Sequence, residues 1–248
     1  MRNVAIIQAR MGSTRLPGKV MTNLCGKSVL EHVIRRVQAC KLLDDVVVAT
    51  TPTPADDVIV AEAERCNANW FRGSEEDVLD RYYQAAQQYR ADVVVRVTSD
   101  CPLFDPELLT KMLETFHTSN LQGRKIDYLS NTLTRTYPRG LDAEIFTFDA
   151  LKKAHHHADK SYEREHVTPY IYRHPETFSL QEIINGENLS SLRWTLDTSQ
   201  DLMFFQAIYS VLFRDDVILE TSEVVSLLKR RPELMAINAD VAQKTNER

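Results

Sequence analysis

Short apolar runs alternate with amphipathic stretches along the first half of the chain. The runs are rich in β-branched residues, as buried parallel strands are, and they cover Asn3–Gln8, Asp45–Thr50 and Asp92–Val97. The stretches between them repeat apolar residues at helical spacing and cover Ser28–Cys40, Asp56–Cys66 and Glu76–Tyr89. Another helix is indicated after Asp105, which can cap it, with Pro106 at the first position. The alternation predicts an α/β fold, a three-layer sandwich around a mostly parallel sheet.

The alternation of strands and helices stops after residue 125. We predict a core over residues 1–125, an α+β insertion over residues 126–190, and a return to the core over residues 191–248. Asp127–Asn131 and Leu141–Phe148 are predicted strands, either of a different sheet or of an extension of the first. The insertion also predicts helices at Leu151–His157 and Glu163–Tyr172 and a strand at Thr177–Ile184. The return predicts a last strand at Arg193–Leu196 and helices at Gln200–Phe213 and Ser222–Arg231, with Ser222 as the cap of the second and Pro232 as its stop.

Composition narrows the function classes. Hydrophobic residues make up 43% of the 248 residues and charged residues 26%, and the net charge is −5. This charge argues against a nucleic acid as the main partner, because binding a polyanion over a wide surface favours a net positive charge. The sequence has no apolar stretch near the roughly 18 residues of a membrane-spanning helix. The four cysteines form no CxxC pair, which suits a reducing cytoplasm.

A long loop after the first predicted strand carries the clearest chemical signal. It holds three of the seven glycines, Gly12, Gly18 and Gly26, together with the cations of Arg10, Arg15 and Lys19. Glycine lets backbone N–H groups turn towards a bound oxyanion, so the loop predicts a triphosphate site. Neither the Walker A spacing nor the GxGxxG fingerprint fits, because five residues separate Gly12 from Gly18 and Val20 follows Lys19. The alternative is a basic surface loop with incidental glycines.

Two aspartates follow predicted strands at the same edge of the sheet as this loop. Asp100 comes after Asp92–Val97, and Asp197 comes after Arg193–Leu196. Two carboxylates that converge on a triphosphate suit Mg²⁺, which prefers one or two carboxylates plus phosphate oxygens. The alternatives are a turn residue before Pro102 for Asp100 and a helix N-cap for Asp197, which can serve both roles.

The segment Ala9–Lys19 resembles the signature of the cytidylyltransferases that activate 3-deoxy-manno-octulosonate and sialic acids, and most of all the SpsF-type spore-coat polysaccharide family. Gln8 stands where many relatives carry proline. The resemblance covers nearly the whole chain and continues through Phe71–Tyr82, Val97–Leu103, Glu163–Tyr170 and Leu196–Leu202.

The resemblance implies a nucleotide-diphospho-sugar transferase fold of the GT-A-like kind, CTP as donor, Mg²⁺ as cofactor, pyrophosphate as product and a homodimer. The reaction it implies is in-line attack of a sugar hydroxyl on the α-phosphorus of CTP, with transfer of CMP for surface polysaccharide synthesis. Lys19, Arg10 and Arg15 would neutralise the leaving pyrophosphate, and Asp100 and Asp197 would hold the metal. The expected nucleotide contacts come from Ala9, Gly12, Ser13, Arg72 and Arg81. Arg81 has an alternative place on the solvated face of a helix.

The insertion is expected to supply the acceptor pocket and to take part in dimerisation. Its candidate acceptor residues are Arg139, Asp142, Glu144, Arg164 and His166, which read alternatively as solvated loop and helix charges. We expect an acidic acceptor sugar, although Thr132–Glu144 does not match the acceptor segments of the octulosonate or sialate enzymes.

Three further hypotheses complete the sequence analysis. The run from His155 to His157 is interpreted as a solvated surface run, because consecutive helical residues point in different directions. A glycosyltransferase of the GT-A class is the alternative function, disfavoured by Ser99-Asp100-Cys101 in place of Asp-x-Asp. A catalytically silent nucleotide-binding regulator is a third possibility, disfavoured by the intact loop and Asp100.

Overall fold

The computed structural model describes residues 1–215 and 217–242. Of the predicted return to the core over residues 191–248, residues 216 and 243–248 therefore lie outside the described part. Seven strands form one sheet, in the spatial order β5 (Asn69–Arg72), β4 (Asp45–Thr50), β1 (Asn3–Gln8), β6 (Val93–Thr98), β8 (Glu144–Thr147), β7 (Tyr128–Ser130) and β9 (Leu180–Glu182). Neighbours in β5, β4, β1 and β6 are parallel, whereas β8 runs antiparallel to β6 and to β7. The strands of residues 126–190 thus extend the first sheet.

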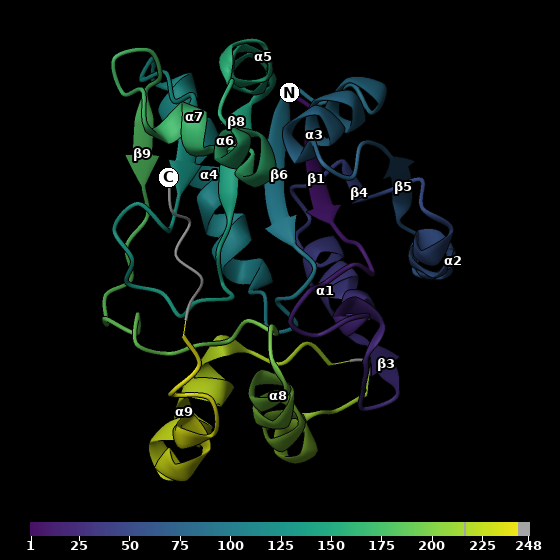
Figure 1. Ribbon diagram of the computed structural model, residues 1–248. Helices are drawn as coiled ribbons and strands as arrows, with labels where there is room; N and C mark the ends of the chain where they lie inside the picture. Colours follow the sequence, from purple (N-terminus) through teal and green to yellow (C-terminus); the bar gives the residue numbers. More distant parts are fainter. Residues whose placement is uncertain (216, 243–248) are drawn as a thin grey trace.

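Helices cover both faces of this sheet, which gives the three layers that the alternation predicts (Figure 1). One face carries α1 (Val29–Gln38), α2 (Asp57–Arg65) and α4 (Pro106–Leu121). The other carries α3 (Val78–Gln88), α5 (Phe148–His157), α6 (Ser161–His166) and α7 (Pro169–Tyr172). The remaining elements are α8 (Ser199–Leu212), α9 (Thr221–Arg230), a small hairpin of β2 (Asn23–Leu24) and β3 (Lys27–Ser28), and short 3₁₀ turns at Lys19–Met21, Pro54–Asp56 and Pro232–Ile237.

Strand alternation divides the core between the two faces. Ala5 and Ile7 of β1 pack with α1 and α4, whereas Val4 and Ile6 pack with α3 and α5. All four side chains are fully buried, as expected for a strand between two helical layers. Within the described part of the chain, every helix falls short of the length and apolarity that a bilayer crossing requires.

The predicted strand Arg193–Leu196 is wrong. The segment is extended, but its backbone hydrogen bonds are to loop residues outside the strands. Trp194 N–H donates to Arg139 O at 2.6 Å, and Leu196 N–H donates to Asp100 O at 2.8 Å. The chain therefore crosses the carboxyl ends of the strands instead of lying beside one of them. Gly140 permits this crossing, since it has φ +101° and a Cβ there would lie 2.0 Å from Trp194 O.

Several other boundaries differ from the sequence prediction. The single helix expected over Glu163–Tyr172 is broken into α6 and α7 at Val167, which has φ +73°. Helix α9 is capped by a reciprocal pair of Glu220 and Glu223, so Ser222 is not its cap. The sequence analysis also missed β5, a strand of only four residues whose side chains are exposed or half-buried and therefore show no apolar run.

Candidate active site

The first loop leaves β1 at its carboxyl end and is held in shape by backbone contacts. Met11 N–H donates to the buried carboxylate of Asp56 at 2.8 Å. Met11 O accepts from the N–H groups of Ser13 at 2.8 Å and Gly18 at 3.0 Å. Gly18 has φ +70°, a conformation that favours glycine, and it begins the short 3₁₀ turn that carries Lys19. The loop therefore presents Lys19 from a fixed backbone.

Lys19 lies between the two aspartates that follow the strands. Its ammonium Nζ is 2.6 Å from Asp100 Oδ2, 2.8 Å from Asp197 Oδ1 and 2.8 Å from the carbonyl oxygen of Leu196. Burial alone lowers the pKa of Lys19, but the two carboxylates outweigh it and raise that pKa above its usual value. Burial likewise raises the pKa of Asp100, but the charge of Lys19 outweighs it and holds that pKa below its usual value. Lys19 and Asp100 are therefore both charged at neutral pH.

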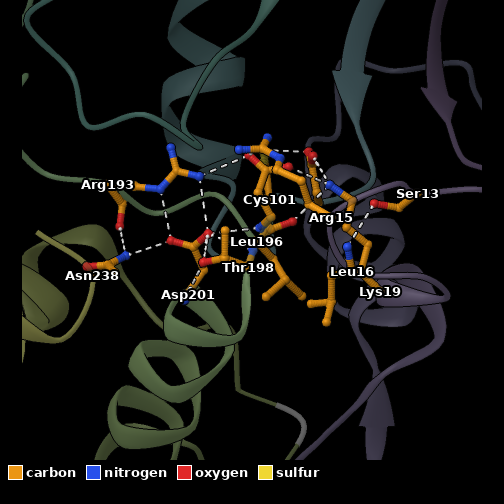
Figure 2. A network of polar contacts seen from close by, with 12 residues as sticks. Ser13, Arg15, Leu16, Lys19, Cys101, Arg193, Leu196, Thr198, Asp201 and Asn238 are labelled. Carbon is orange, nitrogen blue, oxygen red and sulfur yellow. Dashed lines mark hydrogen bonds and ion pairs between the residues drawn. The ribbon is translucent and has the colours of Figure 1, made fainter. Parts of the chain in front are cut away.

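Two arginines pair with the second carboxylate oxygen of Asp197. Asp197 Oδ2 is 2.8 Å from Arg15 and 2.9 Å from Arg193. Arg193 also pairs at 2.9 Å with the fully buried Asp201, whose carboxylate accepts from the Asn238 amide at 3.0 Å as well. Figure 2 shows Arg15 and Lys19 reaching from the first loop towards the segment of Leu196, and Arg193 and Asp201 closing the network on the other side. Asp197 is not the N-cap of α8, because Thr198 caps it in a reciprocal pair with Asp201.

A cavity of about 230 Å³ lies over this cluster. Nine of the predicted site residues line it, namely Ala9, Arg10, Ser13, Arg15, Lys19, Arg81, Asp100, His166 and Asp197. Gln8, the departure from the family pattern, lines it as well. Of the other predicted nucleotide residues, Gly12 is not among the lining residues. Arg72 points elsewhere, donating to Thr51 O at 3.2 Å and pairing with Asp57.

Arg81 does not lie on a solvated helix face. It is 2% exposed and donates to the backbone carbonyl of Ser74, and burial lowers its pKa. The sequence pattern left this open, because the Arg81 side chain packs against the loop at Gly73 and Ser74, and a helical pattern does not show how a loop folds over the helix.

A second cavity of about 440 Å³ adjoins the first, since Thr98 and His166 line both. Arg139, Asp142, Glu144 and His166, four of the five predicted acceptor residues, line it. The structure does not bring Arg164 there: its guanidinium is 2.7 Å from Asp77 and 3.0 Å from two carbonyl oxygens.

Two arginines in this second cavity were missed by the sequence analysis. Arg135 makes a two-pronged pair with Asp142 at 2.6 and 2.8 Å. Arg96 pairs with Glu144, whose carboxylate also accepts from Tyr128 at 2.6 Å and from Thr168. Arg96 left a signal, a lone charge within an apolar strand, whereas Arg135 sits in a polar loop that gives none.

A strained backbone turn places His166 at the junction of the cavities. Val167 has φ +73° and ψ −54°, and Thr168 N–H donates to His166 O at 2.9 Å, which makes a three-residue γ-turn. Such a turn is costly for a buried β-branched residue, on the order of 1–3 kcal/mol. It reverses the chain after α6 so that His166 and Thr168 both face the second cavity.

The prediction of a solvated histidine run is wrong for His155. His155 Nε2 is 2.9 Å from Asp80 and its ring stacks on Tyr83 at 4.2 Å. His156 and His157 are exposed, as expected.

A second group of potential metal ligands lies between α1 and α2, formed by Glu31, Glu62 and Cys66. Arg65 pairs with both of these carboxylates, so their charge is already compensated. Burial raises the pKa of the Cys66 thiol to about 11, which disfavours the thiolate that a metal needs.

Comparison with known proteins identifies the family. The model of the cytidylyltransferase family matches residues 4–222. The spore coat polysaccharide biosynthesis protein SpsF of Bacillus subtilis is 35% identical over 236 residues, 92% of this chain and 94% of its own length. A cytidylyltransferase structure from Leptospira borgpetersenii matches at TM-score 0.90 and 34% identity, over 99% of this chain and 100% of that one. CMP:2-keto-3-deoxy-manno-octonic acid synthetase complexed with CTP shares the fold, at TM-score 0.65 and 16% identity over 85% of this chain and 99% of that one. This chain therefore belongs to the cytidylyltransferase family of nucleotidyltransferases.

Proposed function

We propose that this enzyme transfers CMP from CTP to a hydroxyl group of an acidic sugar and releases pyrophosphate. The observation that carries the proposal is the pair of adjoining cavities, one over the cluster of Lys19, Asp100 and Asp197 and one lined by Arg139. The first cavity suits a triphosphate, because the cationic side chains of Arg10, Arg15 and Lys19 line it. An acceptor bound in the neighbouring cavity would lie beside the phosphates, as transfer requires. Family membership favours this function over a GT-A glycosyltransferase.

The residues around Lys19 fit a magnesium ion. Asp100 and Asp197 offer carboxylate oxygens, the ligands that Mg²⁺ prefers, and an ammonium already lies between them as a stand-in cation. We propose that these two aspartates hold Mg²⁺, which when bound would neutralise phosphate charge. Arg10 and Arg15, which line the same cavity, would stabilise the leaving pyrophosphate by their own charges.

The second cavity favours an anionic acceptor. Arg135 and Arg96 are paired with carboxylates there, but no hydrogen bond or ion pair joins the Arg139 guanidinium to another described residue. Burial and the neighbouring Arg135 lower the pKa of Arg139, so a carboxylate on the acceptor would relieve an unfavourable charge. His166, which lines both cavities, can contact the attacking hydroxyl.

The name of the Bacillus subtilis relative supports a role in surface polysaccharide synthesis. We further propose that the enzyme is a cytoplasmic homodimer with residues 126–190 at the subunit contact.

A pyrophosphate-release assay tests the proposal directly. The enzyme is incubated with Mg²⁺, each of the four nucleoside triphosphates and a panel of matched acidic and neutral sugars. Release should require CTP and an acidic sugar together, and CMP should appear on the sugar by mass spectrometry. Release with a nucleotide other than CTP, or equal release with neutral sugars, would contradict the donor or the acceptor assignment respectively.

A further inference from the structure

The ammonium of Lys19 sits in a cage of three oxygens. These are Asp100 Oδ2 at 2.6 Å, Leu196 O at 2.8 Å and Asp197 Oδ1 at 2.8 Å. An ammonium has three N–H donors, so each donor has one acceptor and the group is saturated. The side chain is only 12% exposed. Two carboxylates and a carbonyl are also the oxygen ligands that a hard divalent cation takes.

One set of oxygens cannot hold both cations at once, because a second positive charge within the cage would repel the ammonium. A divalent ion can therefore bind between Asp100 and Asp197 only if the Lys19 side chain moves away. The nucleotide cavity offers the place to go, since Lys19 lines it together with Arg10 and Arg15. A bound triphosphate would supply oxyanions for the ammonium there.

The carboxylate cage has supports that do not depend on Lys19. Asp197 Oδ2 is held by Arg15 at 2.8 Å and by Arg193 at 2.9 Å. Arg193 is in turn fixed by the buried Asp201. Leu196 is fixed through its own N–H, which donates to the backbone carbonyl of Asp100. When the ammonium leaves, the ligands would stay in position for another cation.

We propose that Lys19 is an internal competitor of the divalent cation, occupying the metal position until a triphosphate draws it into the nucleotide cavity. Metal and nucleotide then bind cooperatively, because each removes the obstacle to the other. By thermodynamic reciprocity, the metal strengthens nucleotide binding by the same factor as the nucleotide strengthens metal binding. This inference rests on the proposed use of a nucleoside triphosphate with a divalent metal.

The first test measures metal binding without nucleotide. Mn²⁺ is titrated into the protein, and free Mn²⁺ is counted by electron paramagnetic resonance. Lys19→Met should bind Mn²⁺ roughly tenfold or more tightly than wild type, within the usual 5–150-fold range of coupling between sites. Arg15→Met is the matched control, because it also removes a positive charge from Asp197 but leaves the ammonium in the cage. An equal gain in both variants, or no gain in Lys19→Met, would overturn the proposal.

The second test uses thermal unfolding and a second variant, so that a folding defect in Lys19→Met would not leave the proposal untested. Without the ammonium, two carboxylates face each other, so Mg²⁺ should raise the melting temperature of Lys19→Met and of the polar variant Lys19→Gln more than that of wild type. If Mg²⁺ raised all three melting temperatures equally, Lys19 would not occupy the metal position.

The third test adds CTP to wild type. CTP should raise the affinity of the protein for Mn²⁺ by roughly tenfold or more. The Mn²⁺ that CTP binds by itself is measured in a protein-free control and subtracted. Tight Mn²⁺ binding to wild type without CTP would refute the competition while leaving the proposed function intact. Failure of CTP to bind at all would instead refute the proposed function, so the two failures are distinguishable.

Discussion

Replacing Gly140 with alanine should damage both stability and the site, because Gly140 packs directly against the backbone of Trp194, in the segment that leads to Asp197. A Cβ at this position would lie 2.0 Å from Trp194 O and 2.4 Å from Trp194 C. Both are backbone atoms, so no flexible side chain can swing away. The residue also has φ +101°, which L side chains rarely adopt.

The magnitude follows from these two effects. The positive φ costs alanine roughly 1–2 kcal/mol. The clash adds displacement of a fully buried tryptophan and of the hydrogen bond from Trp194 N–H to Arg139 O, and strain of this kind costs on the order of 1–3 kcal/mol. We therefore expect Gly140→Ala to lower the free energy of unfolding by about 3 kcal/mol, or the melting temperature by roughly 6–12 °C at this chain length. Turnover should fall as well, because the displaced segment leads into Leu196 and Asp197.

Gly123→Ala is the matched control. Gly123 also has a positive φ, +76°, but a Cβ there would meet nothing within 4 Å. It should show the conformational cost alone, roughly 1–2 kcal/mol, with unchanged turnover. Urea denaturation of both variants measures the difference. Equal destabilisation by the two substitutions would refute the close approach of the Gly140 loop to Trp194.

Four further predictions concern the site. Lys19→Met should reduce turnover by roughly 10²–10³, the scale for losing one preorganised charge, and Asp100→Ala should abolish metal-dependent turnover; near wild-type rates of pyrophosphate release would contradict the assignment. CTP with Mg²⁺ at a hundredfold excess over Kd should stabilise the protein by about 2.7 kcal/mol, and equal thermal shifts with ATP, GTP and UTP would refute cytidine selectivity. The kcat/KM for neutral sugars should be roughly 10²-fold lower than for matched acidic sugars, and Arg139→Ala should reduce this ratio. An unchanged ratio would exclude Arg139 as the residue that contacts the anion of the acceptor. Burial raises the pKa of Asp201, but hydrogen bonds from Arg193 and other donors outweigh it and hold that pKa below its usual value. The ionised Asp201 therefore stabilises the fold fully above about pH 4, and this stabilisation is lost as the pH falls through the lower pKa of the folded state. In urea denaturation between about pH 7 and pH 3, Asp201→Asn should show a smaller loss of unfolding free energy at acid pH than wild type.

The sequence alone determined the layers and the position of the first loop at the carboxyl end of β1. Strands β1 and β4 have the bounds that their apolar runs predict, Asn3–Gln8 and Asp45–Thr50. Both runs are buried on two faces, so periodicity and β-branching suffice to mark them. The sequence also predicted that Asp100 and Asp197 lie together at the first loop, and the structure brings both carboxylates within 2.8 Å of the Lys19 ammonium. Asp100 lies at this edge because it follows the parallel strand β6, as predicted, but Asp197 reaches it because Arg193–Leu196 crosses the strand ends.

Only the tertiary structure decided how the remaining charges are used. Arg164 and Arg139 look equivalent in the sequence, yet Arg164 pairs with Asp77, the N-cap of α3, and Arg139 lines the second cavity. Likewise, Arg193–Leu196 has a strand-like composition, but its backbone partners are Arg139 and Asp100. Local patterns report which face of an element is apolar, whereas a partner from a distant part of the chain is selected by packing, which the local sequence does not encode.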